Sequence, residues 1–207
     1  MNPILETKGL EFLNRISYPD LCVERGESLL ITGLSGSGKS SLLRMINATI
    51  APSSGCIYFH GEDVQESDTI RLRRRILLAG QTPYLFAGTI DENFKEYFHR
   101  IERMPPSQER MRECMAICQA PFEGSADTSN FSGGEKQRVF LSILLSMEPE
   151  VLLLDEPTSA LDDETSRKLL SNLFQYGQAN EMTILIVSHH AEMVLDFVQR
   201  HYRLGGE

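Results

Sequence analysis

The sequence lacks long apolar stretches, and this absence excludes one class of protein. Its longest apolar runs, such as residues 184–187, are far shorter than the about 20 residues that a membrane-spanning helix needs. Residues 1–12 contain neither a basic segment nor an apolar core, so we expect no signal peptide. The sequence therefore predicts no direct insertion into a membrane.

Positive charge is also scarce. The 207 residues include 20 Lys and Arg against 29 Asp and Glu, which gives a formal net charge of −9 at pH 7. A surface that binds nucleic acid or anionic lipid needs clustered Lys and Arg. The composition thus argues against nucleic acid as the main partner, although an acidic balance is also ordinary for a cytosolic protein.

Cysteine is sparse, and its spacing does not suggest a metal site. The four cysteines are Cys22, Cys56, Cys114 and Cys118, with no C-x-x-C pair among them. The spacing of Cys114 and Cys118 places both on one face of a helix. We expect buried or idle thiols in a reducing cytosol.

A glycine-rich stretch at residues 33–41 follows an apolar run at residues 28–32 and opens into a helical pattern at residues 42–46. This order of strand, turn and helix is the context of a phosphate-binding loop, G-x-x-x-x-G-K-S. The stretch, called the phosphate loop below, consists of Gly33, Leu34, Ser35, Gly36, Ser37, Gly38, Lys39, Ser40 and Ser41.

Each part of the phosphate loop has a chemical role. The glycines let backbone N–H groups point inward, and the start of the helix adds the positive end of its dipole. Lys39 can reach the β and γ phosphates, and the Ser40 hydroxyl can coordinate Mg²⁺. The alternative is a turn that matches the pattern by chance, and the flanking strand and helix disfavour it. The loop predicts binding of a nucleoside triphosphate.

Polar residues follow three further apolar runs. Gln81 comes after the run at residues 76–79, Asp155 and Glu156 after residues 151–154, and His189 after residues 183–187. In open parallel sheets ligands bind at the carboxyl edge of the strands. Two carboxylates beside a phosphate loop indicate metal and water chemistry. The alternatives are a capping role for the acids and a structural role for the histidine.

Residues 91–126 have a polar, helical pattern broken by prolines, with no strand signal. Ser132, Gly133, Gly134 and Glu135 then open another helix, where free N–H groups form a second place for an anion. Short strands fill residues 4–32, and residues 52–55 suggest a turn before a strand at residues 56–60. A helix is expected around residues 164–176 and a last strand at residues 201–204.

These patterns, taken in order, resemble the nucleotide-binding domain of ABC ATPases over essentially the whole chain. The discriminating stretch is FSGGEKQR at residues 131–138, which is similar to the signature sequence of that family. The resemblance implies an α/β P-loop NTPase with a mainly parallel core sheet, a small N-terminal antiparallel β subdomain and an inserted helical subdomain at about residues 91–150. It also implies one domain over residues 1–207.

The resemblance assigns roles by position. Asp155 is similar to the aspartate that holds Mg²⁺ together with Ser40 and Gln81. Glu156 is similar to the catalytic carboxylate, His189 to the histidine that hydrogen-bonds the γ phosphate, and Gln81 to the glutamine that contacts the attacking water. Ser132 to Glu135 and Asp162 would contact ATP held by another subunit. ATP and Mg²⁺ are the implied ligands.

The chain departs from the family pattern at several points. Phe131 stands where leucine is usual, Glu135 where glutamine is usual, and Ser41 where threonine is usual. The region before the phosphate loop is short, so the aromatic ring that stacks on adenine is not obvious. Phe12 and Tyr18 are the candidates, with core packing as the alternative for either ring.

The resemblance implies an ATP-hydrolysing subunit that forms a homodimer around ATP and powers a separate transmembrane permease at the cytoplasmic face of the cell membrane. A narrower likeness is to bacterial ATPases of metal export, including iron export. One alternative is a soluble ABC ATPase that acts on nucleic acid or ribosomes without a membrane partner. Another is a small nucleotide kinase, which would not explain residues 131–138.

Overall fold

The computed structural model describes residues 3–205, whose strands form two five-stranded sheets. The antiparallel sheet contains β1 (Leu5–Phe12), β2 (Ile16–Ser17), β3 (Leu21–Val23), β5 (Ser54–Phe59) and β6 (Glu62–Asp63). The parallel sheet has the order β10-β4-β9-β8-β7, with β4 (Ser28–Gly33), β7 (Ile76–Ala79), β8 (Val151–Asp155), β9 (Thr183–Val187) and β10 (Arg200–Leu204). The predicted fold class is confirmed.

The apolar runs of the parallel sheet are buried on both faces. In β8, Val151 and Leu153 belong to one hydrophobic cluster, whereas Leu152 and Leu154 belong to the other. Successive side chains of a strand point to opposite faces, so a strand covered on both sides needs apolar residues at every position. This is why the sequence shows continuous apolar runs here rather than alternation.

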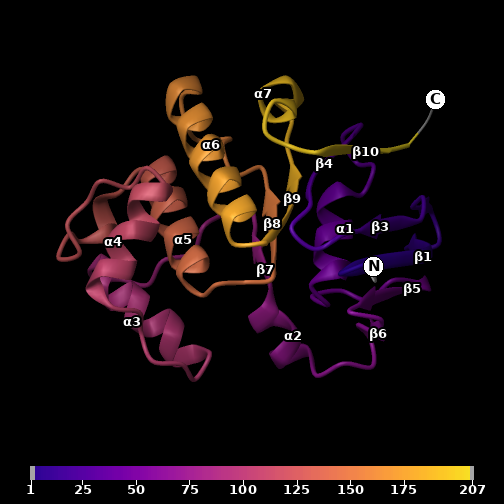
Figure 1. Ribbon diagram of the computed structural model, residues 1–207, viewed down its shortest axis with the longest axis horizontal. Helices are drawn as coiled ribbons and strands as arrows, with labels where there is room; N and C mark the ends of the chain where they lie inside the picture. The colour runs from indigo at the N-terminus through magenta and orange to yellow at the C-terminus, as the bar shows by residue number, and fades with distance from the viewer. Residues whose placement is uncertain (1–2, 206–207) are drawn as a thin grey trace.

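Helix α1 (Lys39–Ile46) lies between the two sheets. Its buried residues Leu42, Leu43, Met45 and Ile46 share a cluster with residues of β5 in the antiparallel sheet and of β9 in the parallel sheet. This packing on both sides holds the start of α1 at the end of β4. Helices α6 (Asp163–Ala179) and α7 (Ala191–Leu195) follow β8 and β9 in the chain (Figure 1).

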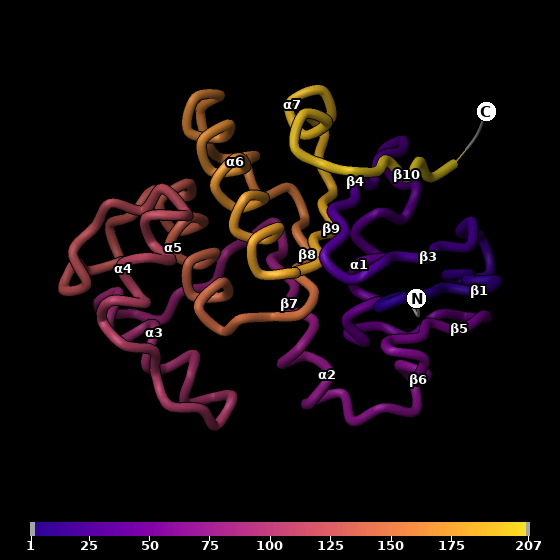
Figure 2. Tube along the Cα trace, in the orientation of Figure 1, coloured from indigo at the N-terminus to yellow at the C-terminus, as the bar shows by residue number. Residues whose placement is uncertain are grey.

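The helical lobe, formed by α3 (Ile90–Arg100), α4 (Gln108–Ile117) and α5 (Gly133–Ser146), lies at the far end of the molecule from the antiparallel sheet (Figures 1 and 2). A capping box starts α3, because Thr89 and Glu92 each bond the other's backbone N–H. The predicted helical insertion is confirmed. A 3-10 turn, η1 (Thr128–Asn130), precedes α5.

The cysteines are free thiols, as expected. Cys114 and Cys118 are buried in the core of the helical lobe, and burial raises the pKa of Cys114 to about 12. Within residues 3–205 no group of three or more His, Cys, Asp and Glu residues could hold a metal ion, and none of the helices there is long and apolar enough to cross a membrane.

One predicted boundary is wrong. Ser54 and Gly55, expected in a turn, begin strand β5. A Cβ at Gly55 would lie 2.3 Å from the carbonyl oxygen of Gly9, because the backbones of β1 and β5 approach closely at an irregular point of their pairing. The glycine is required by this close approach rather than by a chain reversal.

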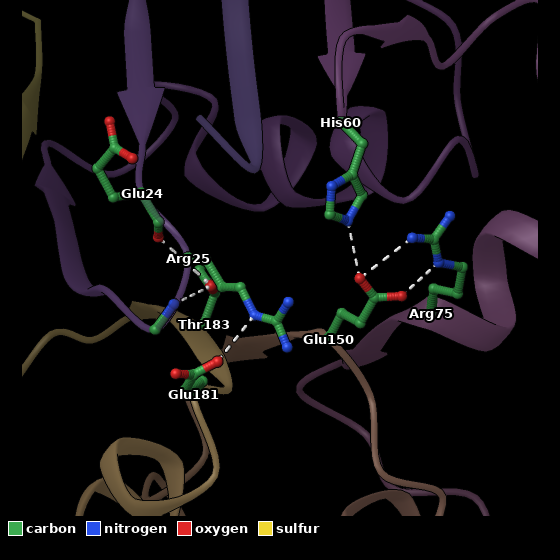
Figure 3. Close-up of polar contacts among 8 residues, drawn as sticks. Glu24, Arg25, His60, Arg75, Glu150, Glu181 and Thr183 are labelled. Atoms are coloured by element: carbon green, nitrogen blue, oxygen red, sulfur yellow. Dashed lines mark hydrogen bonds and ion pairs between the residues drawn. The ribbon is translucent and has the colours of Figure 1, made fainter. Parts of the chain in front are cut away.

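Two groups of polar contacts lie at the amino ends of β8 and β9 (Figure 3). Because β4 runs parallel to β9 and the phosphate loop follows the carboxyl end of β4, these contacts lie at the opposite edge of the sheet from the loop. Glu150 accepts hydrogen bonds from Arg75, at the end of α2 (Thr69–Arg75), and pairs with His60 Nε2 at 2.7 Å. Thr183 Oγ1 accepts the backbone N–H of Gly26 at 2.9 Å. These contacts connect the antiparallel sheet to the parallel one.

Candidate functional site

The phosphate loop begins at Gly33, the last residue of β4, and its final residues from Lys39 onward already belong to α1. The order of strand, turn and helix is as the sequence predicts, but the helix starts at Lys39 rather than at residue 42. Gly36 and Gly38 have φ angles of +81° and +90°, a region that side chains with a Cβ rarely adopt. A hydrogen bond of 3.1 Å from Ser37 N to Leu34 O closes a turn within the loop. The two glycines thus allow the loop to curl ahead of the helix, where free N–H groups gather.

Lys39 is buried beside the loop without an anionic partner. Lys39 is only 7% exposed. Its Nζ donates hydrogen bonds to the carbonyl oxygens of Gly33 at 2.9 Å and Leu34 at 3.1 Å. None of the ion pairs found in residues 3–205 involves Lys39. A buried ammonium with only neutral acceptors favours an anion nearby. The loop therefore fits a phosphate group.

Ser40 and Asp155 meet across the base of the site. The Ser40 hydroxyl donates to Asp155 Oδ1 at 3.0 Å, and Asp155 is 2% exposed at the end of β8. A hydroxyl and a carboxylate are oxygen donors of the kind that Mg²⁺ prefers. These two residues fit the predicted metal role.

Glu156 follows β8 in a strained backbone conformation with a φ of +56°. Its carboxylate is almost fully buried, and Oε2 accepts the backbone N–H of His189 at 3.1 Å. The other oxygen, Oε1, lies 3.4 Å from His189 Nε2 and has no hydrogen-bond partner among the described residues. A buried carboxylate oxygen without a partner is costly, and strain of this kind clusters at functional sites. Glu156 therefore fits a water-binding role.

A cavity of about 250 Å³ brings half of the predicted site residues together. Gln81 and His189, both exposed, join Glu156 and the phosphate loop around it. The lining residues are Ile16, Ser35, Gly36, Gly38, Lys39, Ser40, Ser41, Gln81, Glu156, Val187 and His189. Gly33, Leu34, Ser37 and Asp155 lie outside this lining; Ser37 Oγ is buried without a partner in residues 3–205, and the Leu34 side chain is exposed.

The signature residues do not reach this cavity within the chain. Ser132 is the N-cap of α5 and forms a capping box with Glu135, whose Oε2 accepts Ser132 N at 2.8 Å and Ser132 Oγ at 2.7 Å. These bonds lower the pKa of Glu135. Ser132 and Gly133 are exposed at the start of α5. The signature therefore presents a capped helix N-terminus to the outside.

Gly134 is buried against the loop that precedes α6. A Cβ at Gly134 would lie 2.6 Å from the carbonyl oxygen of Ala160 and 2.8 Å from Leu161 Cδ2. Asp162, at the end of that loop, is the N-cap of α6 and accepts Thr165 N at 2.9 Å, which lowers the pKa of its carboxyl. The start of α5 and the loop before α6 thus pack directly against each other. Asp162 is engaged in capping and, like the signature, does not line the cavity.

The expectation that Tyr18 could stack on adenine is wrong. Its ring is 4% exposed and belongs to the core, which is the alternative that the sequence left open. Phe12 is half-buried and packs against the same core, so its stacking role stays a prediction. Ile16, which sequence reasoning missed, lines the cavity beside the phosphate loop. Its position in the two-residue strand β2 carries no motif that could have identified it.

Comparison with known proteins gives a family match. The family model described as "ABC transporter" matches residues 16–159. The chain is 33% identical over 190 residues to Protein STAR1 of Oryza sativa, covering 91% of this chain and 54% of that protein. It is 36% identical over 179 residues to the methionine import ATP-binding protein MetN of Corynebacterium efficiens, covering 84% and 50%. The chain thus spans about half the length of these two relatives.

Other similar proteins are spanned more fully. The energy-coupling factor transporter ATP-binding protein EcfA of Methanothermobacter thermautotrophicus is 32% identical over 219 residues, covering 98% of this chain and 68% of that protein. The structure of cbiO1 from Clostridium perfringens, described as part of the ABC transporter complex cbiONQ, superposes with a TM-score of 0.85 at 26% identity, covering 99% and 85%. A dimeric post-hydrolysis state of the ATP-binding cassette MJ0796, bound to ADP and Pi, gives 0.82 at 24% identity, covering 97% and 94%, and shows the shared fold.

Proposed function

The chain belongs to the ABC transporter family, and we propose that it binds Mg-ATP and hydrolyses it as the energising subunit of a transporter. The observation that carries this proposal is the cavity of about 250 Å³ that joins Lys39, Ser40, Gln81, Glu156 and His189. It contains a buried cation without an anionic partner and a buried carboxylate oxygen without a donor among the described residues. A triphosphate and a water molecule would satisfy both groups.

The phosphate loop would hold the triphosphate. Lys39 would exchange its hydrogen bonds to carbonyl oxygens for charge-assisted bonds to the β and γ phosphates, which are stronger. Ser40, Asp155 and Gln81 would hold Mg²⁺, and the bound ion supplies charge neutralisation on the phosphate oxygens. Phosphoryl transfer depends chiefly on such positioning and neutralisation.

Glu156 and His189 would act on the attacking water. Glu156 Oε1 can accept a hydrogen bond from that water and later its proton, while Oε2 stays fixed by the backbone N–H of His189. The His189 ring, exposed at the edge of the cavity, would donate to the γ phosphate. Gln81, which follows the neighbouring strand β7, would also contact this water.

A second copy of the chain would complete each site. Ser132, Gly133, Gly134 and Asp162 lie outside the cavity, so they can contact its nucleotide only if a partner supplies them. Free N–H groups at the exposed start of α5 suit an anion. The homodimer is in keeping with MJ0796, a cassette of the same fold that is described as dimeric and bound to ADP and Pi.

The family supports a membrane partner for this chain. Similar proteins are named as ATP-binding parts of transporters, and cbiO1 is described as part of a larger complex. We infer that a separate transmembrane permease binds this subunit at the cytoplasmic face of the membrane. Export of metal or iron is a narrower proposal that rests on sequence resemblance alone, since the names of similar proteins include methionine import and multidrug resistance.

Replacement of Lys39 tests nucleotide binding. Lys39→Ala should weaken Mg-ATP binding by at least about 30-fold in titration calorimetry, because the phosphates lose a charge-assisted partner in a buried site. Lys168→Ala is the matched control, since Lys168 forms only an exposed pair with Glu164. Circular dichroism must show that both variants fold. Wild-type affinity in the Lys39 variant, or no binding by the wild-type protein, would overturn the proposal.

A further inference from the structure

Tyr18 lies directly against the phosphate loop, although it is not part of any motif. Its hydroxyl donates a hydrogen bond of 3.1 Å to the carbonyl oxygen of Gly38. Gly38 precedes α1 and lines the cavity, whereas Tyr18 does not. The ring is 4% exposed, and the backbone N–H of Tyr18 donates to Leu10 O at 2.9 Å. The phenol is therefore buried against the loop without lining the cavity.

This contact controls one peptide group of the loop. A trans peptide is planar, so its C=O and N–H point in opposite directions. The bond from Tyr18 holds the Gly38 carbonyl on the core side, which aims the following N–H, that of Lys39, toward the phosphate site. The same carbonyl accepts Leu42 N at 2.8 Å in the first turn of α1. Tyr18 thus adds a second hydrogen bond that orients the Gly38–Lys39 peptide, where the loop and the helix meet.

The phenol also explains why residue 38 has no side chain. A Cβ at Gly38 would lie 2.3 Å from the Tyr18 hydroxyl oxygen and 3.1 Å from Cζ. Burial raises the pKa of Tyr18 to about 12, so the hydroxyl keeps its proton and remains a donor at neutral pH. Loop and ring are therefore matched in shape as well as in hydrogen bonding.

We propose that Tyr18 is a positioning residue for nucleotide phosphates, which orients the Gly38–Lys39 peptide without touching the ligand. The proposal rests on the proposed ATP-binding function and deepens it. It separates the loop's geometry from the chemistry of hydrolysis, because Glu156 and His189 follow other strands, β8 and β9, and no hydrogen bond found within residues 3–205 joins either of them to Tyr18. Loss of the hydroxyl should therefore weaken the binding of nucleotide phosphates more than it lowers the rate at which bound ATP is hydrolysed.

Tyr18→Phe tests this role, since it keeps the ring and removes only the hydroxyl. We expect KM for ATP, and the Kd of Mg-ATP and Mg-ADP from calorimetry, to rise about fivefold, the size typical of one lost neutral hydrogen bond. The kcat should stay within about twofold of the wild-type value. A merely structural role would instead reduce the active fraction, which lowers kcat and leaves KM unchanged.

Tyr97→Phe is the matched control, because the Tyr97 hydroxyl also donates to a backbone carbonyl, that of Tyr84, in the helical lobe. It should leave nucleotide affinity within about twofold, while thermal unfolding reports any loss of stability in either variant. Unchanged KM and Kd in Tyr18→Phe, or an equal change in Tyr97→Phe, would reject the positioning role while the ATP-binding proposal stands. A wild-type protein without affinity for Mg-ATP would remove both.

Discussion

The Ser40 hydroxyl donates to Asp155 Oδ1 at 3.0 Å, which joins the start of α1 to the end of β8 across 115 positions of the chain. The two residues belong to motifs that the sequence shows separately. Their contact fixes the distance between the phosphate loop and the carboxyl edge of the sheet. Glu156, the next residue, is thereby held at the cavity with one oxygen unpaired within residues 3–205.

Replacement of Glu156 should separate ATP binding from hydrolysis. In Glu156→Gln the amide can still hold a water but cannot accept its proton, so we expect ATP affinity within about threefold and a loss of at least about 100-fold in kcat. Gel filtration with ATP should reveal a trapped dimer. Glu181→Gln is a suitable control, because Glu181 forms an exposed pair with Arg25 away from the cavity. A Glu156 variant with the wild-type rate would place the base elsewhere.

Replacement of Glu135 should have little effect. Glutamine is an accepted partner in a capping box, so Glu135→Gln can still bond the backbone N–H of Ser132. We expect ATPase activity within about twofold of wild type and helix stability within about 0.5 kcal/mol. Glu135→Ala, which cannot close the box, is the contrasting variant for thermal unfolding. A large loss of activity in Glu135→Gln would show that the charge contacts the nucleotide.

The network around Glu150 should make stability depend on pH. Burial alone raises the pKa of Glu150, but hydrogen bonds from Arg75 and His60 outweigh it, so the pKa lies below its ordinary value of 4.5. A carboxyl whose pKa is lowered by folding stabilises the native state above the unfolded-state pKa. That contribution is lost as the pH falls below 4.5 through the folded-state pKa.

Glu150→Gln tests this dependence. The side chain is 32% exposed, so solvent screening limits the expected loss at pH 7 to about 1 kcal/mol. The difference from wild type in urea unfolding should shrink steadily below pH 4.5. Glu148→Gln, at a side chain 64% exposed, serves as control and should show a smaller difference at every pH. A Glu150 difference that is constant from pH 7 to pH 3 would contradict the linkage.

Much of the architecture could be predicted because local signals and tertiary packing agree. Strands β7 and β9 match the expected runs at residues 76–79 and 183–187, since each is a buried apolar segment between polar or turn residues. The turn predicted at Gly55 is wrong because a glycine is needed there for the close approach of Gly9 in another strand, and the local sequence does not show that approach. The strand order β10-β4-β9-β8-β7 likewise depends on packing rather than on any one segment.

Part of the site could not be predicted for the same reason. The phosphate loop, Gln81, Glu156 and His189 carry motifs or follow apolar runs, and the structure brings them to one cavity. Ile16 carries no pattern, and Tyr18 suggests only adenine stacking or core packing, so only the folded chain places them beside Gly38. Asp162 was assigned by position alone, and its side chain caps α6 through Thr165. Sequence motifs identify groups that perform chemistry better than groups that hold them in place.

The last prediction concerns which subunit supplies each half of a site. Ser132 does not line the cavity that contains Lys39, so within our proposal the signature must come from the partner. Two-fold symmetry then creates two composite sites. Lys39→Ala and Ser132→Arg homodimers should each be inactive, because both of their sites carry a lesion.

A mixture of the two inactive variants should regain activity. In the mixed dimer both lesions fall in one site, and the other site combines an intact phosphate loop with an intact signature. We expect up to about half of the wild-type ATPase rate per mixed dimer if the sites act independently. A site completed within one chain predicts no recovery at any ratio. Circular dichroism is needed for Ser132→Arg, since loss of the N-cap costs about 1 kcal/mol.

Obligatory cooperation between the two sites would also suppress recovery, and a second mixture separates this cause. Wild-type protein with an excess of Ser132→Arg forms dimers that contain one intact site. If these dimers hydrolyse ATP while the mixture of the two inactive variants stays silent, the sites are independent and completed within one chain, and the trans arrangement is wrong. If both mixtures are inactive, the intact site needs its neighbour, and the trans arrangement is then tested by ATP-dependent dimer formation of the variants in gel filtration.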